Sequence, residues 1–512
     1  MKNIKHIIIV LFFLVIANSC SNYEELNTNP DAATSVSPDM LAAGVLKGAF
    51  RFWNPNPNDF TTGNLQAHHL VNQDLSGEQY YNPYPYGSFG SFQNLTDLKR
   101  MVEFSEGSVS ESSYKGLALF MKAWYGFNNT ISMGDIPYSE AGQAEEGNVT
   151  PKYDTQADVI AQVLEDLKAA EQFFAAGTTF SGDIMYNGDP TKWRKLCNGM
   201  QLKVIQTISK KASAAQKTRF AEIVTANNLL GSNSDNFKLT YTDYSGTNHP
   251  FYTATEARRL KDIPSKLVVD MLKKYNDRRL FYFAEPAAAL ISGGMQANEF
   301  SAYEGALSSL SNGVITSNNQ AGNYCTINKR YGEVHAGDPM LKFTYAEQSF
   351  IIAEAIEEGW VSGGSAAAKV YYENGVKAML DLFKSLPAAS AANYAHGMAI
   401  DQTYIDNYFT GDADYAMTGT KTDREHQIWD QRYLIDFFQG NGLNYPQILR
   451  TGYPVLPLDP ATSLNPEDNT LYPKRLKYPT AEITTNPGNY QAAIDSQYGG
   501  FDGINKVPWY LQ

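Results

Sequence analysis

Apolar side chains recur at helical spacing in several separate stretches of the chain. The clearest stretch begins at Thr155, which forms a capping-box-like start with Asp158, and Gly177 is expected to end it. The same spacing predicts further helices over 112–132, 191–210 and 266–275. The pattern therefore predicts a mainly α-helical protein.

The segment 341–383 predicts two antiparallel helices. The first ends at Gly359, and its apolar positions are Phe343, Ala346, Phe350, Ala353 and Ala355. Gly363 and Gly364 form the predicted turn, and Ser365 is expected to cap the second helix. That helix carries the apolar positions Val370, Tyr371, Ala378 and Phe383. Small alanines on facing positions let the helices approach closely, which is typical of a tetratricopeptide-like hairpin, although no regular repeat runs through the whole chain.

Long polar stretches separate the predicted helices, over 54–92, 230–251, 287–340 and 387–425. Loops of this length are uncommon in compact domains and are often functional. A few short strands are expected within them, for example over 237–242. The predicted fold is a tetratricopeptide-like helical-repeat scaffold with long irregular loops and a few short strands, in a single domain over 39–512.

The N-terminal segment has the pattern of a secretory signal. Lys2 and Lys5 precede an unbroken apolar run over 7–17, which is too short to span a bilayer, and Cys20 follows. A signal that ends on cysteine resembles a bacterial lipoprotein signal, whose thiol carries acyl chains such as palmitate that hold a protein on a membrane. We therefore expect a signal peptide over 1–19 and a lipidated leader over 20–38. The alternative is an ordinary signal peptide with an incidental cysteine.

The chain is acidic, with a formal net charge of −13, and no block of basic residues stands out. Such a surface repels phosphate backbones, so nucleic acid is not expected as a partner. Apart from Cys20, the cysteines are Cys197 and Cys325. The sequence does not decide whether these two form a disulfide, although a buried free thiol suits Cys197 within its predicted helix.

The densest aromatic run follows no helical or strand period. It contains Tyr80, Tyr81, Tyr84, Tyr86 and Phe89, interrupted by prolines and glycines. One interpretation is an exposed platform on which sugar rings or peptide side chains stack, with Asp74 and Gln79 as hydrogen-bonding neighbours. The alternative is that these rings fold back as structural pegs. Weaker ligand-binding candidates are Trp53, His249 and Tyr252.

Catalytic and metal-binding motifs are missing from the sequence. The histidines form no pair spaced for a zinc hydrolase, and no nucleophile elbow, phosphate-binding loop or dinucleotide fingerprint occurs. We therefore expect no enzyme activity, no catalytic residues, no metal ligands and no cofactor. A structural calcium ion stays open, because such sites leave little trace in a sequence.

Several segments together resemble the SusD/RagB family of outer-membrane lipoproteins of Bacteroidetes. They are the run Gly-Asp-Ile-Pro-Tyr-Ser-Glu-Ala at 134–141, the segment 151–155, the Trp193 helix with Asn198 and Leu202, the segment 345–360, and the segments 449–454 and 472–479. Asp277-Arg278-Arg279-Leu280 departs from the Asp-Pro-Arg-Leu that the family often has. Most matching residues belong to the scaffold, and we expect Asp135 and Arg450 to be buried structural charges.

The resemblance implies a surface-exposed nutrient-binding lipoprotein, anchored in the outer membrane and facing the cell exterior. Such proteins capture oligosaccharides and pass them to a SusC-like TonB-dependent barrel transporter. Glu24 and Glu25 are similar to acidic surface-display signals of this phylum. A peptide-binding member of the same family is the alternative, and a surface glycoside hydrolase or a structural adhesin is weaker. The identity of the nutrient and the stoichiometry with the transporter stay open.

Overall fold

The computed structural model describes residues 36–50, 57–74, 86–244, 246–253, 256–385, 393–439 and 444–512. The predictions for Cys20, Trp53, Gln79, Tyr80, Tyr81 and Tyr84 lie outside these residues.

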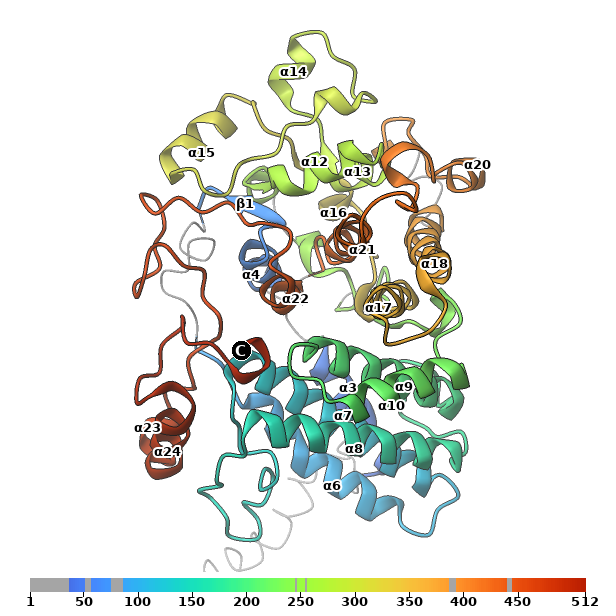
Figure 1. Cartoon of the computed structure of the whole chain (residues 1–512), viewed down its shortest axis with the longest axis vertical. Coiled ribbons are helices and arrows are strands. Elements are labelled where there is room, and N and C mark those ends of the chain that lie inside the picture. The colour runs from blue at the N-terminus through green and yellow to red at the C-terminus, as the bar shows by residue number, and fades with distance from the viewer. Residues whose placement is uncertain are drawn as a thin grey trace, which may run out of the picture.

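A bundle of long helices makes up one half of the molecule (Figure 1). Its members are α3 (Pro38–Ala49), α6 (Asn94–Ser105), α7 (Glu111–Met133), α8 (Gln156–Ala175), α9 (Pro190–Thr207) and α10 (Ala214–Ala226). Each of α7, α8 and α9 packs on the next along the chain. The Thr155 side chain accepts a hydrogen bond from the Asp158 backbone amide, which confirms the predicted start of α8. We call these helices the N-terminal bundle.

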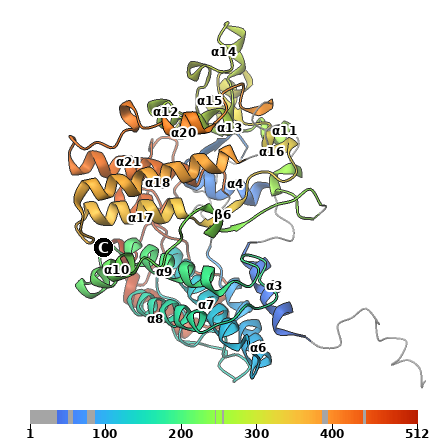
Figure 2. The same cartoon turned by 90° about the vertical axis from the view of Figure 1, so that its right-hand side faces the viewer.

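A second layer of helices lies above this bundle (Figure 2). It consists of α17 (Tyr345–Glu357), α18 (Gly364–Lys384) and α21 (Lys421–Ile435). The other helices of the described residues are shorter: α4 (Pro57–Gln66), α11 (Glu256–Arg259), α12 (Lys266–Lys274), α13 (Arg279–Phe283), α14 (Ala288–Ser292), α15 (Asn312–Gln320), α16 (Arg330–Glu333), α20 (Gln402–Asp406), α22 (Asn444–Thr451), α23 (Glu482–Thr485) and α24 (Pro487–Tyr498). The last two lie beside the N-terminal bundle (Figure 1), where the Tyr498 hydroxyl donates to the Met133 carbonyl at the end of α7.

Strands in the described residues are short and form antiparallel pairs. They are β1 (Leu70–Asn72) with β3 (Asp262–Pro264), β2 (Phe237–Leu239) with β6 (Met340–Phe343), and β4 (Ala284–Glu285) with β5 (Thr326–Ile327). The predicted class, a mainly α helical-repeat scaffold with a few short strands, is confirmed.

The predicted helical hairpin is confirmed as α17 and α18, with three corrections. Phe343 belongs to β6, because Thr344 caps the Glu347 amide and α17 begins only at Tyr345. Gly363 holds the cap position of α18, and the Ser365 hydroxyl instead donates to Glu357. Val370 is exposed, because the buried face of α18 runs through other positions of the helix.

The prediction of long irregular loops needs a correction too. The stretches 54–92, 287–340 and 387–425 contain α4, α14, α15, α16 and α20. α14 has only five residues, which is too short for a helical period to show, and the other helices carry too few apolar positions for one. The expected strand near 237–242 is present as β2.

Several ionic groups and both thiols of the described residues lie in the interior. Asp135 and Arg450 are buried, as predicted. Asp277 and Arg279 form a fully buried ion pair at 2.6 Å in the segment that departs from the family pattern. Cys197 and Cys325 are both buried and free, so they form no disulfide with each other.

Candidate functional site

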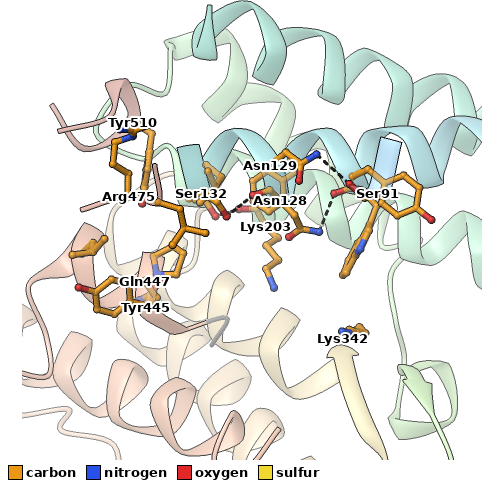
Figure 3. A pocket seen from close by; sticks show the side chains of 18 of the residues that line it. Ser91, Asn128, Asn129, Ser132, Lys203, Lys342, Tyr445, Gln447, Arg475 and Tyr510 are labelled. Carbon is orange, nitrogen blue, oxygen red and sulfur yellow. Dashed lines mark hydrogen bonds between the residues drawn. The ribbon is translucent and has the colours of Figure 1, made fainter. Parts of the chain in front are cut away.

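A cavity of about 620 Å³ lies between the N-terminal bundle and the second layer. Its walls come from α7 and α9 on one side, and from β6, α17, α21 and α22 on the other. The segment around the 3₁₀ turn Gly90–Gln93 and the C-terminal segment 474–476 complete it. Segments far apart in the sequence therefore build one site (Figure 3).

A row of amide and hydroxyl groups lines the α7 wall. Asn128, Asn129 and Ser132 follow one face of this helix, and Ser91 lies beside them (Figure 3). The Asn129 amide donates to the Ser91 hydroxyl at 3.1 Å, and the Asn128 amide donates to the Trp124 carbonyl at 2.9 Å. Each carboxamide oxygen accepts no hydrogen bond from the described residues, so both are available to a ligand. We call Ser91, Asn128, Asn129 and Ser132 the amide row.

Aromatic side chains line the same cavity. Trp124 and Tyr125 lie on α7, while Tyr445 lies in the first turn of α22 and Tyr510 lies near the C-terminus. The Tyr445 hydroxyl donates to the Pro473 carbonyl at 2.7 Å, which fixes its ring at one end of the cavity. Figure 3 shows Tyr445 and Tyr510 there, beside Gln447 and Arg475. The cavity therefore presents both aromatic rings and amide groups to a ligand.

Basic side chains outnumber acidic ones on the cavity wall. The lining includes Lys203, Lys342, Arg432, Arg450, Lys474 and Arg475, against Glu347 as the one carboxylate among the described lining residues. Lys203 pairs with Glu347 at 2.8 Å. Behind the wall, Glu354 pairs with Arg432 at 3.2 Å and with Arg450 at 2.7 Å.

A smaller cavity of about 310 Å³ lies on the other side of Arg450. Trp360 and Trp429 line it, together with Glu354 and Glu358. The Lys217 ammonium group lies 5.0 Å from the centre of the Trp360 ring. Glu354 and Arg450 therefore form a partition between the two cavities.

The end of the predicted aromatic platform reaches the rim of the larger cavity. Tyr86 is 51% exposed, and the Gly87 amide that follows it is held by the Lys477 carbonyl at 2.7 Å. Phe89 is half-buried and stacks on Phe92 with ring centres 5.8 Å apart. Ser88, between them, lines the cavity. Within the described residues, the run thus contains both an exposed ring and a packed one.

The other predicted ligand-binding residues lie away from this cavity. His249 is buried and packs against Tyr241, and burial lowers its pKa to about 4. Tyr252 is half-buried, with its ring centre 4.0 Å from that of His335. Neither residue lines the cavity, so a ligand-binding role for either one stays a prediction that needs another site.

Asp74 is exposed and forms an ion pair with Lys261 at the end of the β1–β3 pair. Next to it, Asp262 is fully buried and accepts a hydrogen bond from Asn72 at 2.5 Å. Burial raises the pKa of the Asp262 carboxyl to about 6, against the opposing charge of Arg258, and the charge of Asp74 adds to the rise.

This raised pKa predicts that stability falls as pH rises. Between about pH 4 and about pH 6 the folded protein keeps the Asp262 proton that the unfolded chain has released, so unfolding releases a proton. The free energy of unfolding should therefore decrease across this window, and Asp262→Asn should flatten the slope. Urea denaturation of both proteins at the two ends of this pH window measures the change in the free energy of unfolding. Parallel slopes for the two proteins would contradict the assignment.

The amide row and the basic wall escaped the sequence analysis. The sequence holds one local signal, because Asn128 and Asn129 are adjacent amides that directly follow the mainly apolar stretch 123–127. Lys474 and Arg475 belong to the segment 472–479 that carries the family resemblance, but nothing local indicates that they or Lys203 line a cavity, since the other segments of the wall are remote in the chain.

The described residues contain no group of three or more His, Cys, Asp or Glu side chains placed to hold a metal ion. No helix in the described ranges is both long and apolar enough to cross a membrane.

Comparisons with known proteins agree with this architecture. A family model described as "Starch-binding associating with outer membrane" matches residues 30–479. A SusD homologue from Bacteroides fragilis NCTC 9343 is 34% identical, with a TM-score of 0.86 over 93% of this chain and 100% of that chain. An outer membrane protein from Bacteroides vulgatus ATCC 8482, whose description connects it with nutrient binding, is 30% identical, with a TM-score of 0.81 over the same shares.

A more distant structure shares the fold alone. It is a chitin-binding SusD homologue from Flavobacterium johnsoniae, 19% identical, with a TM-score of 0.69 over 93% of this chain and 98% of that chain. The search of curated proteins found no match. The family model spans most of the sequence, and the 34% identical homologue matches along its whole length. The chain therefore belongs to the SusD-like family, whose members are described as starch-binding and associating with the outer membrane.

Proposed function

We propose that this protein is a non-catalytic, surface-exposed receptor that captures oligosaccharides in the larger cavity. It is anchored in the outer membrane through lipidated Cys20 and passes its cargo to a SusC-like TonB-dependent transporter. The amide row beside aromatic rings is the observation that carries the proposal. Membership of the SusD-like family and the descriptions of its nutrient-binding and chitin-binding relatives support it.

The chemistry of the cavity suits a sugar. Each sugar hydroxyl is both a donor and an acceptor, and the carboxamides of Asn128 and Asn129 present both kinds of partner. Aromatic side chains such as Tyr445 give apolar surface for the C–H faces of sugar rings. A volume of about 620 Å³ lies within the usual range for small-molecule sites. It holds a short stretch of glycan, which leaves the rest of a longer chain outside.

Removing both amides of the row should weaken glycan binding. Each lost hydrogen bond contributes about 1 kcal/mol, so Asn128→Ala with Asn129→Ala should raise Kd roughly tenfold or more. An immobilised panel of neutral and acidic oligosaccharides identifies a ligand, and calorimetry measures Kd. Asn407→Ala is the matched control, because Asn407 is exposed and makes the same bond to a carbonyl four residues earlier.

Three results would contradict this proposal. An unchanged Kd in the double variant would place the ligand elsewhere. Binding of peptides without glycans would favour the peptide-binding alternative. New reducing ends that accumulate during incubation with a glycan would indicate a hydrolase. Co-purification from outer membranes tests the transporter partner separately.

A further inference from the structure

The charge of the larger cavity is opposite to that of the whole protein. The chain carries a net charge of −13, yet basic side chains dominate the described cavity lining. Low-dielectric walls concentrate the field of such a cluster and raise the local concentration of anions. The imbalance points to a negatively charged ligand group.

Most of these cations already have a protein carboxylate as partner. Lys203 pairs with Glu347, and Arg432 and Arg450 share Glu354. Lys474 differs, because it forms no ion pair within the described residues although it is partly buried on the cavity wall. Burial and the nearby charge of Lys210 both lower its pKa. An anion beside Lys474 would offset both effects.

The neighbouring Arg475 adds positive charge behind the same wall. Its Nε donates to the Met133 carbonyl at 2.9 Å, its Nη1 donates to Asp502 at 2.5 Å, and its guanidinium packs on the ring of Tyr498. None of these partners lines the cavity. The Nε2 of Gln447, which faces the same end of the cavity (Figure 3), has no hydrogen-bond partner among the described residues.

Buried donors without partners are costly, and a ligand oxygen that accepts from them removes this cost. A carboxylate fits best, because it accepts several hydrogen bonds and also balances the charge of Lys474. The amide row on the adjoining α7 wall can form hydrogen bonds with the uncharged hydroxyl groups of the same ligand. One end of the cavity is therefore basic, while another wall is neutral and polar.

We propose that the cavity selects acidic oligosaccharides, with a uronic acid carboxylate bound at Lys474 and Gln447 and neutral hydroxyls bound along the amide row. This inference rests on the proposed function and specifies its substrate class. Lys474 then determines specificity, because a neutral sugar leaves the charge of this lysine unmatched.

Matched pairs of probes test this selectivity. Oligomers of galacturonate, guluronate and glucuronate-containing glycans are titrated into the wild-type protein, each beside the same oligomer after chemical reduction of its carboxyl groups to hydroxymethyl groups. At least one acidic oligomer should bind at least about tenfold more tightly than its reduced form, and added salt should weaken only the acidic one.

Two variants assign the effect to the basic end. Lys474→Gln should weaken binding of the acidic oligomer roughly tenfold and so bring its Kd close to that of the reduced form. Lys168→Gln, at an exposed position of α8 outside both cavities, should change neither. Thermal melting of both variants checks that they fold.

The outcomes separate this inference from the proposed function. Equal binding of acidic and reduced oligomers would overturn the selectivity and leave the glycan receptor intact. An unchanged Kd of the acidic oligomer for Lys474→Gln would show that its carboxylate does not bind at this end of the cavity. Binding of neither set would overturn the selectivity, and the panel of neutral oligosaccharides then tests the glycan receptor by itself. Binding of acidic peptides alone would overturn both proposals.

Discussion

Replacing Glu354 with alanine should lower the free energy of unfolding by about 3–5 kcal/mol, because it leaves buried charges without a partner. Glu354 is 2% exposed. Its carboxylate pairs with Arg450 at 2.7 Å and Arg432 at 3.2 Å, and accepts a hydrogen bond from Gln206 at 2.7 Å. These partners come from α22, α21 and α9, so one carboxylate connects the N-terminal bundle to the second layer.

Urea denaturation of Glu354→Ala measures this effect. The matched control is Glu145→Ala, which removes an exposed ion pair with Arg100 and should cost less than about 1 kcal/mol. If Glu354→Ala lowered the free energy of unfolding no more than the control does, Arg432 and Arg450 would have found other partners. The connecting role of Glu354 would then be wrong.

Replacing Trp193 with alanine should have a similarly large effect, about 3–5 kcal/mol. Trp193 is fully buried at the centre of the N-terminal bundle. Its ring centre lies 5.2 Å from that of Phe120, 5.3 Å from Tyr186 and 5.7 Å from Phe174. The surrounding rings are too rigid to fill the space that alanine would leave.

A second substitution at the same position separates packing from hydrogen bonding. The Trp193 indole N–H donates to Asp183 at 2.8 Å. Trp193→Phe keeps most of the ring contacts and loses this bond, so it should cost about 1–3 kcal/mol. Thermal and urea unfolding of both variants measure the difference. Equal losses for Trp193→Phe and Trp193→Ala would show that the hydrogen bond dominates and the packing argument fails.

The sequence predicted the long helices because their signals are local. The cap at Thr155 and the apolar period after it belong to the same short segment as α8 itself. The start of α17 was placed too early because Phe343 continues the apolar pattern of the helix. Only its pairing with Phe237, a contact made in the folded chain, assigns Phe343 to a strand.

The site was less predictable than the fold because its parts meet only on folding. The aromatic run ending at Phe89 indicated the rim of the cavity, since Ser88 and Ser91 belong to it. The opposite end depends on Arg475, whose orientation is set by Met133 and Asp502. No periodicity in the sequence reports such long-range contacts. Asp74 and His249 are polar side chains of a kind that can contact a ligand. In the folded chain Asp74 pairs with Lys261, and His249 packs against Tyr241.

The two free thiols give this protein intrinsic reporters of local opening. Burial raises the pKa of Cys325 to about 12 and moves that of Cys197 in the same direction, so almost no reactive thiolate exists near neutral pH. A thiol reagent added to the native protein therefore modifies each cysteine only when its surroundings open. Cys197 lies on α9, and Cys325 lies beside β5. The labelling rate of each cysteine therefore measures how often its own region opens, and no engineered probe is needed.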